Sequence, residues 1–285
     1  MTSDCVPVSS LSIWQPIHLG TDETGNPVYV NLAERNMLIG GEPGSGKSVA
    51  LQLIAAHAAL SADVRMILTD GKRVELGLWA ECADKFVGPS IDDAIDVLHG
   101  LQNLIDERTE QLLQMRKRKV TPDLGWPFYL LLIDEVAYFS ATVGTSVQQK
   151  EFNACNRDVV ARGRAPGIIP VEATQRPSAD IIPTSLRDLF GYRWAFRCST
   201  EASSDTILGH VWANQGYSAT EIDPQARGVS WLRAEEGIPR RMKAAYLTDE
   251  DIIDLAATAA TARTKTAPKP GSGNVIKLRR DGDAA

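Results

Sequence analysis

The sequence lacks several features that mark specialised classes of protein. Its four cysteines, Cys5, Cys82, Cys155 and Cys198, are scattered and include no Cys-x-x-Cys pair. This spacing predicts free thiols in a reducing compartment, with neither a disulfide framework nor a zinc site. No apolar run approaches the roughly 20 residues of a membrane-spanning helix, and the first ten residues do not have the pattern of a signal peptide. We therefore expect a cytoplasmic protein that reaches a membrane only through a partner.

An excess of positive charge is also absent. The 285 residues include 30 Lys and Arg against 36 Asp and Glu, which gives a formal net charge of −6 and a pI near 5.3. This balance argues against a protein coated with positive charge for nucleic acid, so any contact with DNA has to come from local basic clusters. The hydrophobic share of 44% is ordinary for a globular protein with one large core or two smaller ones.

The most informative motif present is Gly41-Glu42-Pro43-Gly44-Ser45-Gly46-Lys47-Ser48. It has the pattern G-x-x-x-x-G-K-S, in which backbone N–H groups line a nest for phosphates. We predict that Lys47 reaches the β- and γ-phosphates and that the Ser48 hydroxyl holds Mg²⁺. The apolar residues before this loop predict a strand, and the Ala- and Leu-rich residues after it predict a helix that begins near Lys47. The motif therefore predicts a site for a nucleoside triphosphate.

A second motif, Leu130–Glu135, is an apolar strand that ends in two carboxylates, the Walker B pattern. We predict that Asp134 holds the Mg²⁺ shell and that Glu135 is the general base that activates water. A GTPase switch protein would usually carry a glycine motif and a glutamine here, so the pair favours ATP. Gln175 follows another apolar strand and is a candidate sensor of the γ-phosphate or the attacking water; the alternative is a plain turn before Pro177.

Strands and helices alternate along the chain. The predicted strands cover residues 17–19, 28–32, 37–39, 64–69, 128–133, 167–173 and 192–198, and the predicted helices cover 48–60, 91–118, 148–162 and 248–262. This alternation predicts an α/β fold with a mainly parallel sheet covered by helices on both faces. We expect an N-terminal lead-in (residues 1–24), a main ATPase domain (25–262) and a tail (263–285) that its basic and polar composition marks as flexible.

In their order, these motifs resemble the motor domain of the FtsK/SpoIIIE DNA translocases. The resemblance covers about residues 25–256 and is carried by Gly25–Ala33 with the glycine-rich loop, Asp70–Leu76, Leu130–Glu135 and Gly163–Ser178. The last stretch, G-R-A-P-G-I-I-P-V-E-A-T-Q-R-P-S, is the most diagnostic because generic P-loop ATPases lack it. The resemblance implies a RecA-like P-loop ATPase fold, ATP and Mg²⁺ as cofactors, and a hexameric ring of identical chains around double-stranded DNA.

The chain also departs from the family pattern. Family members at division septa carry membrane helices before the motor and a winged-helix DNA reader after it, and neither is recognisable here. A short motor of this kind is similar to the transfer (Tra) proteins of actinobacterial conjugative plasmids and integrative elements, which move double-stranded DNA between cells. This likeness, which rests on architecture, implies conjugative DNA transfer. The alternatives are an ATPase module of a type VII-like protein-secretion motor and a non-catalytic nucleotide-binding adaptor.

A ring ATPase needs a cation from the neighbouring subunit to stabilise charge on the transferred phosphoryl group. Arg108 falls on the apolar stripe of the long predicted helix, where a charge has to be paired or face something special. The family resemblance implies a trans-acting finger near this place, and we predict Arg108, with Arg162 and Arg164 as rivals. The alternative for Arg108 is a local ion pair with Asp106 or Glu107, or a side chain that extends to the surface.

Two loops are the predicted contacts with DNA: residues 138–149 after the Walker B strand, and residues 176–193, which contain Arg187. Contacts from such loops go to phosphates and read no sequence. The basic run Arg116-Lys117-Arg118-Lys119 is instead predicted to complement the dipole of the preceding helix. Lys72 and Glu75 are predicted to hold the loop after the second strand near a subunit contact, with an exposed charged turn as the alternative.

Overall fold

The computed structural model describes residues 11–235 and 237–266, so the first ten residues and most of the predicted tail lie outside the described residues. Ten strands form one sheet in the order β2-β1-β10-β9-β8-β3-β7-β6-β4-β5. The six strands from β8 to β5 are parallel, and the four others pair in antiparallel fashion. The strands are β1 (Ile17–Asp22), β2 (Pro27–Val30), β3 (Met37–Gly40), β4 (Val64–Thr69), β5 (Lys85–Val87), β6 (Phe128–Ile133), β7 (Ile168–Thr174), β8 (Tyr192–Phe196), β9 (Val229–Ala234) and β10 (Arg240–Ala244).

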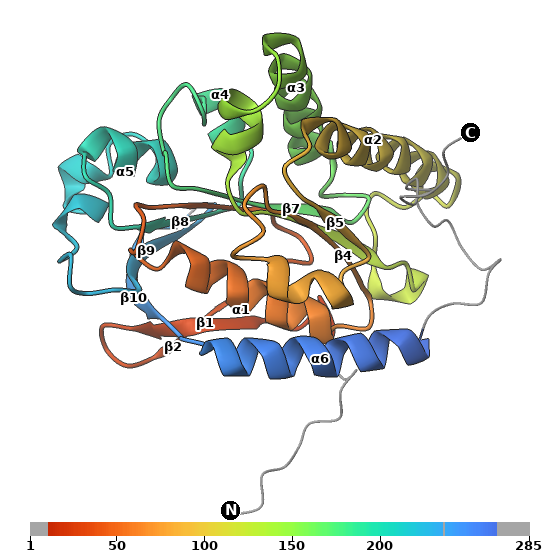
Figure 1. Ribbon diagram of the computed structural model, residues 1–285, viewed down its shortest axis with the longest axis horizontal. Coiled ribbons are helices and arrows are strands. Elements are labelled where there is room, and N and C mark those ends of the chain that lie inside the picture. The colour runs from red at the N-terminus through yellow and green to blue at the C-terminus, as the bar shows by residue number, and fades with distance from the viewer. Residues whose placement is uncertain (1–10, 236, 267–285) are drawn as a thin grey trace, which may run out of the picture.

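Helices cover both faces of this sheet, as the sequence predicted (Figure 1). In Figure 1, α2 to α5 lie above the sheet, whereas α1 and α6 lie below it, where the antiparallel strands bend so that β1 passes beneath α1. The α-helices are α1 (Lys47–Leu60), α2 (Ile91–Gln114), α3 (Ser146–Arg162), α4 (Thr184–Arg187), α5 (Glu201–Leu208) and α6 (Asp249–Thr266). The predicted α/β architecture is confirmed.

The central strands are buried on both faces. Every residue of β3, β6 and β7 is buried, as the continuous apolar runs of a covered parallel sheet predict. One hydrophobic cluster lies on the α1 side and includes Trp194, and the other lies on the α2 and α3 side and includes Phe139 and Phe152. The sheet is thus a rigid middle layer that fixes the position of every loop at its edges.

The parallel strands give the sheet two distinct edges. Their carboxyl ends share one edge, where the glycine-rich loop follows β3, Asp134 follows β6 and Gln175 follows β7. In open α/β sheets, ligands bind at this edge. The amino ends of the same strands share the opposite edge, where residues 117–121 and 161–165 come together.

The structure differs from the sequence prediction at several element boundaries. The long helix α2 ends at Gln114, four residues early, and Arg116 then adopts a left-handed backbone with φ 56°. Strand β1 lies inside the predicted lead-in of residues 1–24, yet it pairs with β10 in the same sheet. Ile13 is fully buried there. Among the described residues, no helix has both the length and the apolarity to cross a membrane.

Candidate active site

The glycine-rich loop adopts a conformation that needs glycine. Gly44 has φ 75° and Gly46 has φ 115°, in the left-handed region that residues with a side chain rarely adopt. A Cβ atom on Gly46 would also lie 2.9 Å from the Cα of Gly228. The Gly228 N–H donates to the Ser45 carbonyl at 2.9 Å, which ties the loop to the turn before β9. Helix α1 begins at Lys47, so its N-terminus is directed at the place for phosphates.

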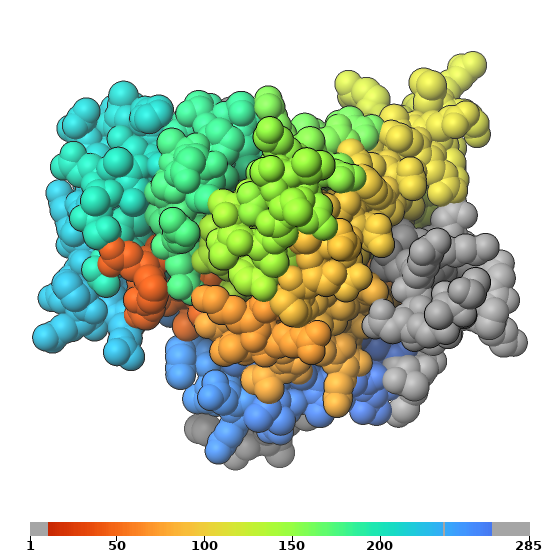
Figure 2. Space-filling model, turned by 45° about the horizontal axis from the view of Figure 1, so that its top comes forward, coloured from red at the N-terminus to blue at the C-terminus, as the bar shows by residue number. Residues whose placement is uncertain are grey.

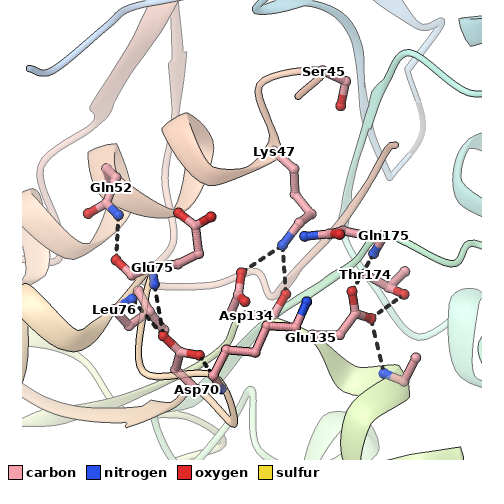
Figure 3. A network of polar contacts seen from close by, with 12 residues as sticks. Ser45, Lys47, Gln52, Asp70, Glu75, Leu76, Asp134, Glu135, Thr174 and Gln175 are labelled. Atoms are coloured by element: carbon pink, nitrogen blue, oxygen red, sulfur yellow. Dashed lines mark hydrogen bonds and ion pairs between the residues drawn. The ribbon is translucent and has the colours of Figure 1, made fainter. Parts of the chain in front are cut away.

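Lys47 and Asp134 form a buried ion pair between the two predicted motifs (Figure 3). The Lys47 Nζ donates to the Asp134 carboxylate at 2.6 Å and to the Asp134 carbonyl at 2.8 Å. A buried charge needs a counter-charge, and the Asp134 carboxylate provides it for Lys47. The loop of β3 and the end of β6 therefore meet as the sequence predicted.

The oxygens near Lys47 suit Mg²⁺. Ser48 is the second residue of α1, and Asp134 follows β6, so a hydroxyl and a carboxylate are available at this edge. Mg²⁺ prefers oxygen ligands and keeps several waters, with one or two carboxylates and substrate phosphates completing the shell. Within residues 11–235 and 237–266, no group of three or more His, Cys, Asp or Glu could hold a metal alone. This donor set fits a metal that arrives with a nucleotide.

Both carboxylate oxygens of Glu135 are held in place. Thr174 Oγ1 donates to one oxygen at 2.7 Å, and the Gln175 backbone N–H donates to the other at 2.7 Å. The Ala137 N–H also donates to the first oxygen, at 3.2 Å. Figure 3 shows the Gln175 side chain directed toward Lys47. The end of β7 thus orients the predicted base. Thr174 was missed because no local motif indicates a partner 39 residues away in the sequence.

The loop after β4 is folded around Asp70. This carboxylate is 1% exposed and accepts backbone hydrogen bonds from four residues: Lys72, Arg73, Glu75 and Leu76. The Gln52 side chain of α1 donates to the Glu75 carbonyl at 2.6 Å, and in Figure 3 the Glu75 carboxylate lies on the Lys47 side of the loop. These hydrogen bonds give the loop after β4 a defined conformation beside the site and connect it to α1.

The structure assigns Arg108 a structural role, which corrects the prediction of a trans-acting finger. Arg108 is 5% exposed. Its guanidinium donates to the carbonyls of Pro127 and Pro166, both at 2.8 Å, and lies over the rings of Trp126 and Tyr129. Burial lowers the pKa of Arg108. A side chain with these internal partners is not presented to a neighbouring chain.

The two rival arginines lie at the opposite edge of the sheet. A pocket of about 750 Å³ opens there, and its lining includes Arg118, Arg162 and Arg164. Arg162 forms ion pairs with Asp158 and Asp106, whereas the half-exposed Arg164 has a 3.4 Å contact with Glu235. The Val120 N–H donates to the Ala165 carbonyl at 2.9 Å and joins the two sides of the pocket.

The predicted DNA loops are more structured than expected. Arg187 is buried, forms an ion pair with Asp188 and donates to the Asp205 carbonyl, so it is not available to DNA. Arg193 joins the same cluster, and burial with the neighbouring arginines lowers its pKa to about 10. In the first loop, residues 138–142 form a π-helical turn. Arg176 and residues 144–147 remain exposed.

Comparison with known sequences finds similarity to one family in the first half of the chain. Residues 12–123 match the sequence profile of the FtsK/SpoIIIE family. The DNA translocase FtsK of Treponema pallidum is 29% identical over 260 residues, which is 85% of this chain and 31% of that protein. The FtsK of Staphylococcus aureus strain Mu50 is 27% identical over 268 residues, or 84% of this chain and 32% of that protein. The chain therefore spans about a third of the length of these relatives.

Solved structures show the same fold at low sequence identity. The conjugation coupling protein TcpA of pCW3, as a monomer with ATPγS, has a TM-score of 0.76 and 18% identity; the match covers 92% of this chain and 74% of TcpA. The cytoplasmic domain of the type VII secretion ATPase EccC from Thermomonospora curvata has a TM-score of 0.70 and 19% identity, and the match covers 90% of this chain and 33% of EccC. These likenesses confirm a RecA-like ATPase fold.

Proposed function

We propose that this chain, a P-loop ATPase domain of the FtsK/SpoIIIE type, is an ATP-driven translocase of double-stranded DNA. The observation that carries the proposal is the convergence of Lys47, Asp134 and Glu135 at one sheet edge, with Glu135 held by Thr174 and the Gln175 backbone. A non-catalytic adaptor would not need a base held through both oxygens. Residues 25–262 form the motor domain in this proposal, residues 1–24 are a lead-in whose strand β1 joins the sheet of that domain, and 263–285 are the tail.

Each residue has a distinct task in the proposed reaction. The glycine-rich loop and the start of α1 bind the triphosphate, and Lys47 exchanges its bond to Asp134 for bonds to the β- and γ-phosphates. Ser48 and Asp134 would hold Mg²⁺, which supplies charge neutralisation between the phosphates when it is bound. Glu135 accepts the proton of the attacking water. Gln175 lies beside both groups and is the proposed sensor of the γ-phosphate.

Arg164 is the proposed trans-acting finger, in place of Arg108. It lies at the amino edge of the sheet, opposite the phosphate loop of its own chain, so its charge can serve only a neighbouring site. A ring of identical chains, with six as the proposed number, brings the amino edge of one subunit to the carboxyl edge of the next. Arg118 lines the same pocket and adds to its positive potential.

The proposed DNA contacts lie on the face that carries α3 and α4. In Figure 2, the lime-green segment near residue 145 lies at the centre of this face, between α2 and α5. Its exposed residues include Thr145 and Ser146 beside the apolar Val147, and Arg176 is exposed after β7. Hydroxyl, backbone and arginine donors of this kind bind phosphates without reading sequence.

Conjugative transfer is the finer proposal. It is supported by the likeness to TcpA, a conjugation coupling protein, and by the resemblance to actinobacterial Tra proteins. In this role the chain would work in the cytoplasm and would use a membrane-anchored partner as its tether. The alternative, a module of a protein-secretion motor, is supported by the likeness to EccC.

The test is the ATPase rate of the purified chain with and without duplex DNA. A translocase is expected to hydrolyse ATP several-fold faster with long duplex DNA, and the Glu135→Gln variant should bind ATP without this turnover. Stimulation by a secretion-substrate peptide but not by DNA would support the alternative motor. An ATPase rate that is the same with and without duplex DNA would contradict the translocase proposal.

A further inference from the structure

A buried carboxyl group without a charged partner lies in the middle of the sheet. Glu172 of β7 is 0% exposed, and its strand neighbours in register are Leu38 and Ile133. Asn156 of α3 donates to one oxygen of Glu172 at 3.0 Å. The other oxygen of Glu172 and the Asn156 amide oxygen have no partner among the described residues. Burial raises the pKa of Glu172 to about 8, against the opposing effect of the Asn156 hydrogen bond.

This pair is unexpected on grounds of stability. A central strand covered on both faces is normally apolar, and an unsatisfied buried polar group costs about 1–3 kcal/mol. A neutral carboxylic acid offers an O–H donor, and the Asn156 amide oxygen is an acceptor without a donor. A neutral Glu172 also avoids a buried negative charge without a counter-charge. A polar link of this kind joins strand and helix in one specific arrangement, which apolar contacts do not.

One end of the link is the catalytic end of β7. Thr174 lies two residues after Glu172, on the same face of the strand, because side chains alternate between faces. Thr174 and the Gln175 N–H hold the two oxygens of Glu135, each at 2.7 Å. A change in the contacts of Glu135 therefore acts directly on the strand that contains Glu172.

The other end of the link is the segment after Glu135, residues 138–145, which we call the post-Walker segment. Helix α3 contacts this segment through residues that lie one turn before Asn156. The Asn153 side chain donates to the Ser140 carbonyl at 3.1 Å, and the Phe152 ring stacks on Phe139 with centroids 5.5 Å apart. The segment contains a π-helical turn, a feature frequent at functional sites.

We propose that Glu172 and Asn156 couple the catalytic end of β7 to the post-Walker segment through α3. In this role Glu172 is a positioning residue. It transmits a change in the contacts of Glu135 to the post-Walker segment, the surface that contacts the translocated polymer. The proposal rests on the function proposed above for identifying that polymer as DNA. The mechanical link itself requires only nucleotide binding at the phosphate loop.

Hydrogen exchange with and without ATPγS tests the link. In the wild type, ATPγS should slow exchange in residues 138–145 by about threefold or more, as well as in the phosphate loop. The variant Glu172→Leu/Asn156→Leu removes both polar groups and leaves neither unpaired. It should keep the protection of the phosphate loop and lose that of residues 138–145. Glu172→Gln keeps a neutral acceptor for Asn156 and should behave as the wild type.

The outcomes separate this proposal from the proposed function. If residues 138–145 respond to ATPγS in the double variant as in the wild type, or respond in neither, the link is wrong. Asn156→Ala should lose the same response, so the test does not depend on folding of the double variant. An ATPase rate that duplex DNA does not change would contradict the translocase function. It would not affect the conclusion from hydrogen exchange in residues 138–145. Where DNA stimulates the wild type, Glu172→Leu/Asn156→Leu should lose most of that stimulation.

Discussion

Glu135 is held by a hydroxyl from another strand, so a single methyl-for-hydroxyl exchange tests its orientation. The Thr174→Val variant keeps the shape of the side chain and removes the 2.7 Å hydrogen bond to Glu135. A hydrogen bond to a charged group contributes about 1.5–3 kcal/mol, so kcat should fall about tenfold or more. ATP affinity should change less than about twofold, because the phosphate loop is untouched.

Thr174→Ser is the matched control, since it retains the hydroxyl group. Steady-state ATPase assays and binding of a fluorescent ATP analogue would measure both quantities. Wild-type turnover in Thr174→Val would mean that the Gln175 and Ala137 N–H groups suffice to orient Glu135.

The second residue-scale prediction concerns Glu172 and pH. Burial raises the pKa of the Glu172 carboxyl from 4.5 to about 8, so the folded state holds this proton to higher pH than the unfolded chain does. Between these values the folded state binds more protons, so its stability falls as pH rises, by at most about 1.4 kcal/mol per pH unit. The contribution is complete below pH 4.5 and is lost as pH rises through about 8.

Denaturant unfolding of the wild type and Glu172→Gln at pH 5 and pH 8 measures this difference. The wild type should lose about 2–4 kcal/mol more than the variant between the two pH values. Equal losses would mean that Glu172 is ionised in the folded protein.

At the scale of elements, Arg108 fastens α2 to the turns before β6 and β7. Its two hydrogen bonds to the Pro127 and Pro166 carbonyls and its two ring contacts are lost in Arg108→Ala. We expect unfolding free energy to fall by about 2–4 kcal/mol in denaturant titrations. Glu110→Ala, at an exposed position of the same helix, is the control and should stay within about 0.5 kcal/mol of the wild type. An Arg108→Ala variant that is stable but inactive would restore Arg108 as the finger.

The elements that the sequence predicted best are those with continuous apolar runs. Strands β3, β6 and β7 were expected within one or two residues, even though β7 contains a proline and a glutamate. Strand β5 was missed because its three residues have no periodicity of their own, and pairing with β4 defines it. Helix α2 was overextended because Lys and Arg are good helix formers, whereas the left-handed Arg116 ends it.

Within the site, too, residues in contiguous motifs were predicted, and residues defined by distant partners were not. Lys47, Asp134 and Glu135 were predictable because each follows a strand within a contiguous motif. Thr174, Asp70 and Glu172 act through partners that are distant in the sequence or that belong to the backbone, and no local pattern indicates them. Arg108 was misassigned because its partners are carbonyls and rings, which are not visible as opposite charges in the sequence.

For the whole molecule, the separation of the phosphate loop and Arg164 onto opposite edges predicts complementation between defective chains. Lys47→Ala loses nucleotide binding but still offers Arg164, whereas Arg164→Ala binds ATP but offers no finger. Each variant alone should be inactive. An equimolar mixture should recover activity, because about a quarter of randomly formed interfaces pair an intact site with an intact finger.

The mixture is measured by its ATPase rate over a range of protein concentrations, with size-exclusion chromatography to verify assembly. Wild-type specific activity should also rise with concentration. Assembled mixtures that stay inactive would exclude Arg164 as a residue that acts across the interface.

Strand β7 has a consequence for the timing of such a ring. It begins four residues after Arg164 and ends at Thr174, so about 20 Å of extended backbone lies between the proposed finger and the residue that holds the proposed base of the same subunit. A strand buried between two neighbours bends little. The nucleotide state of one site would therefore reach the next site as a small displacement along a rigid strand. Subunits coupled in this way would hydrolyse ATP in order around the ring.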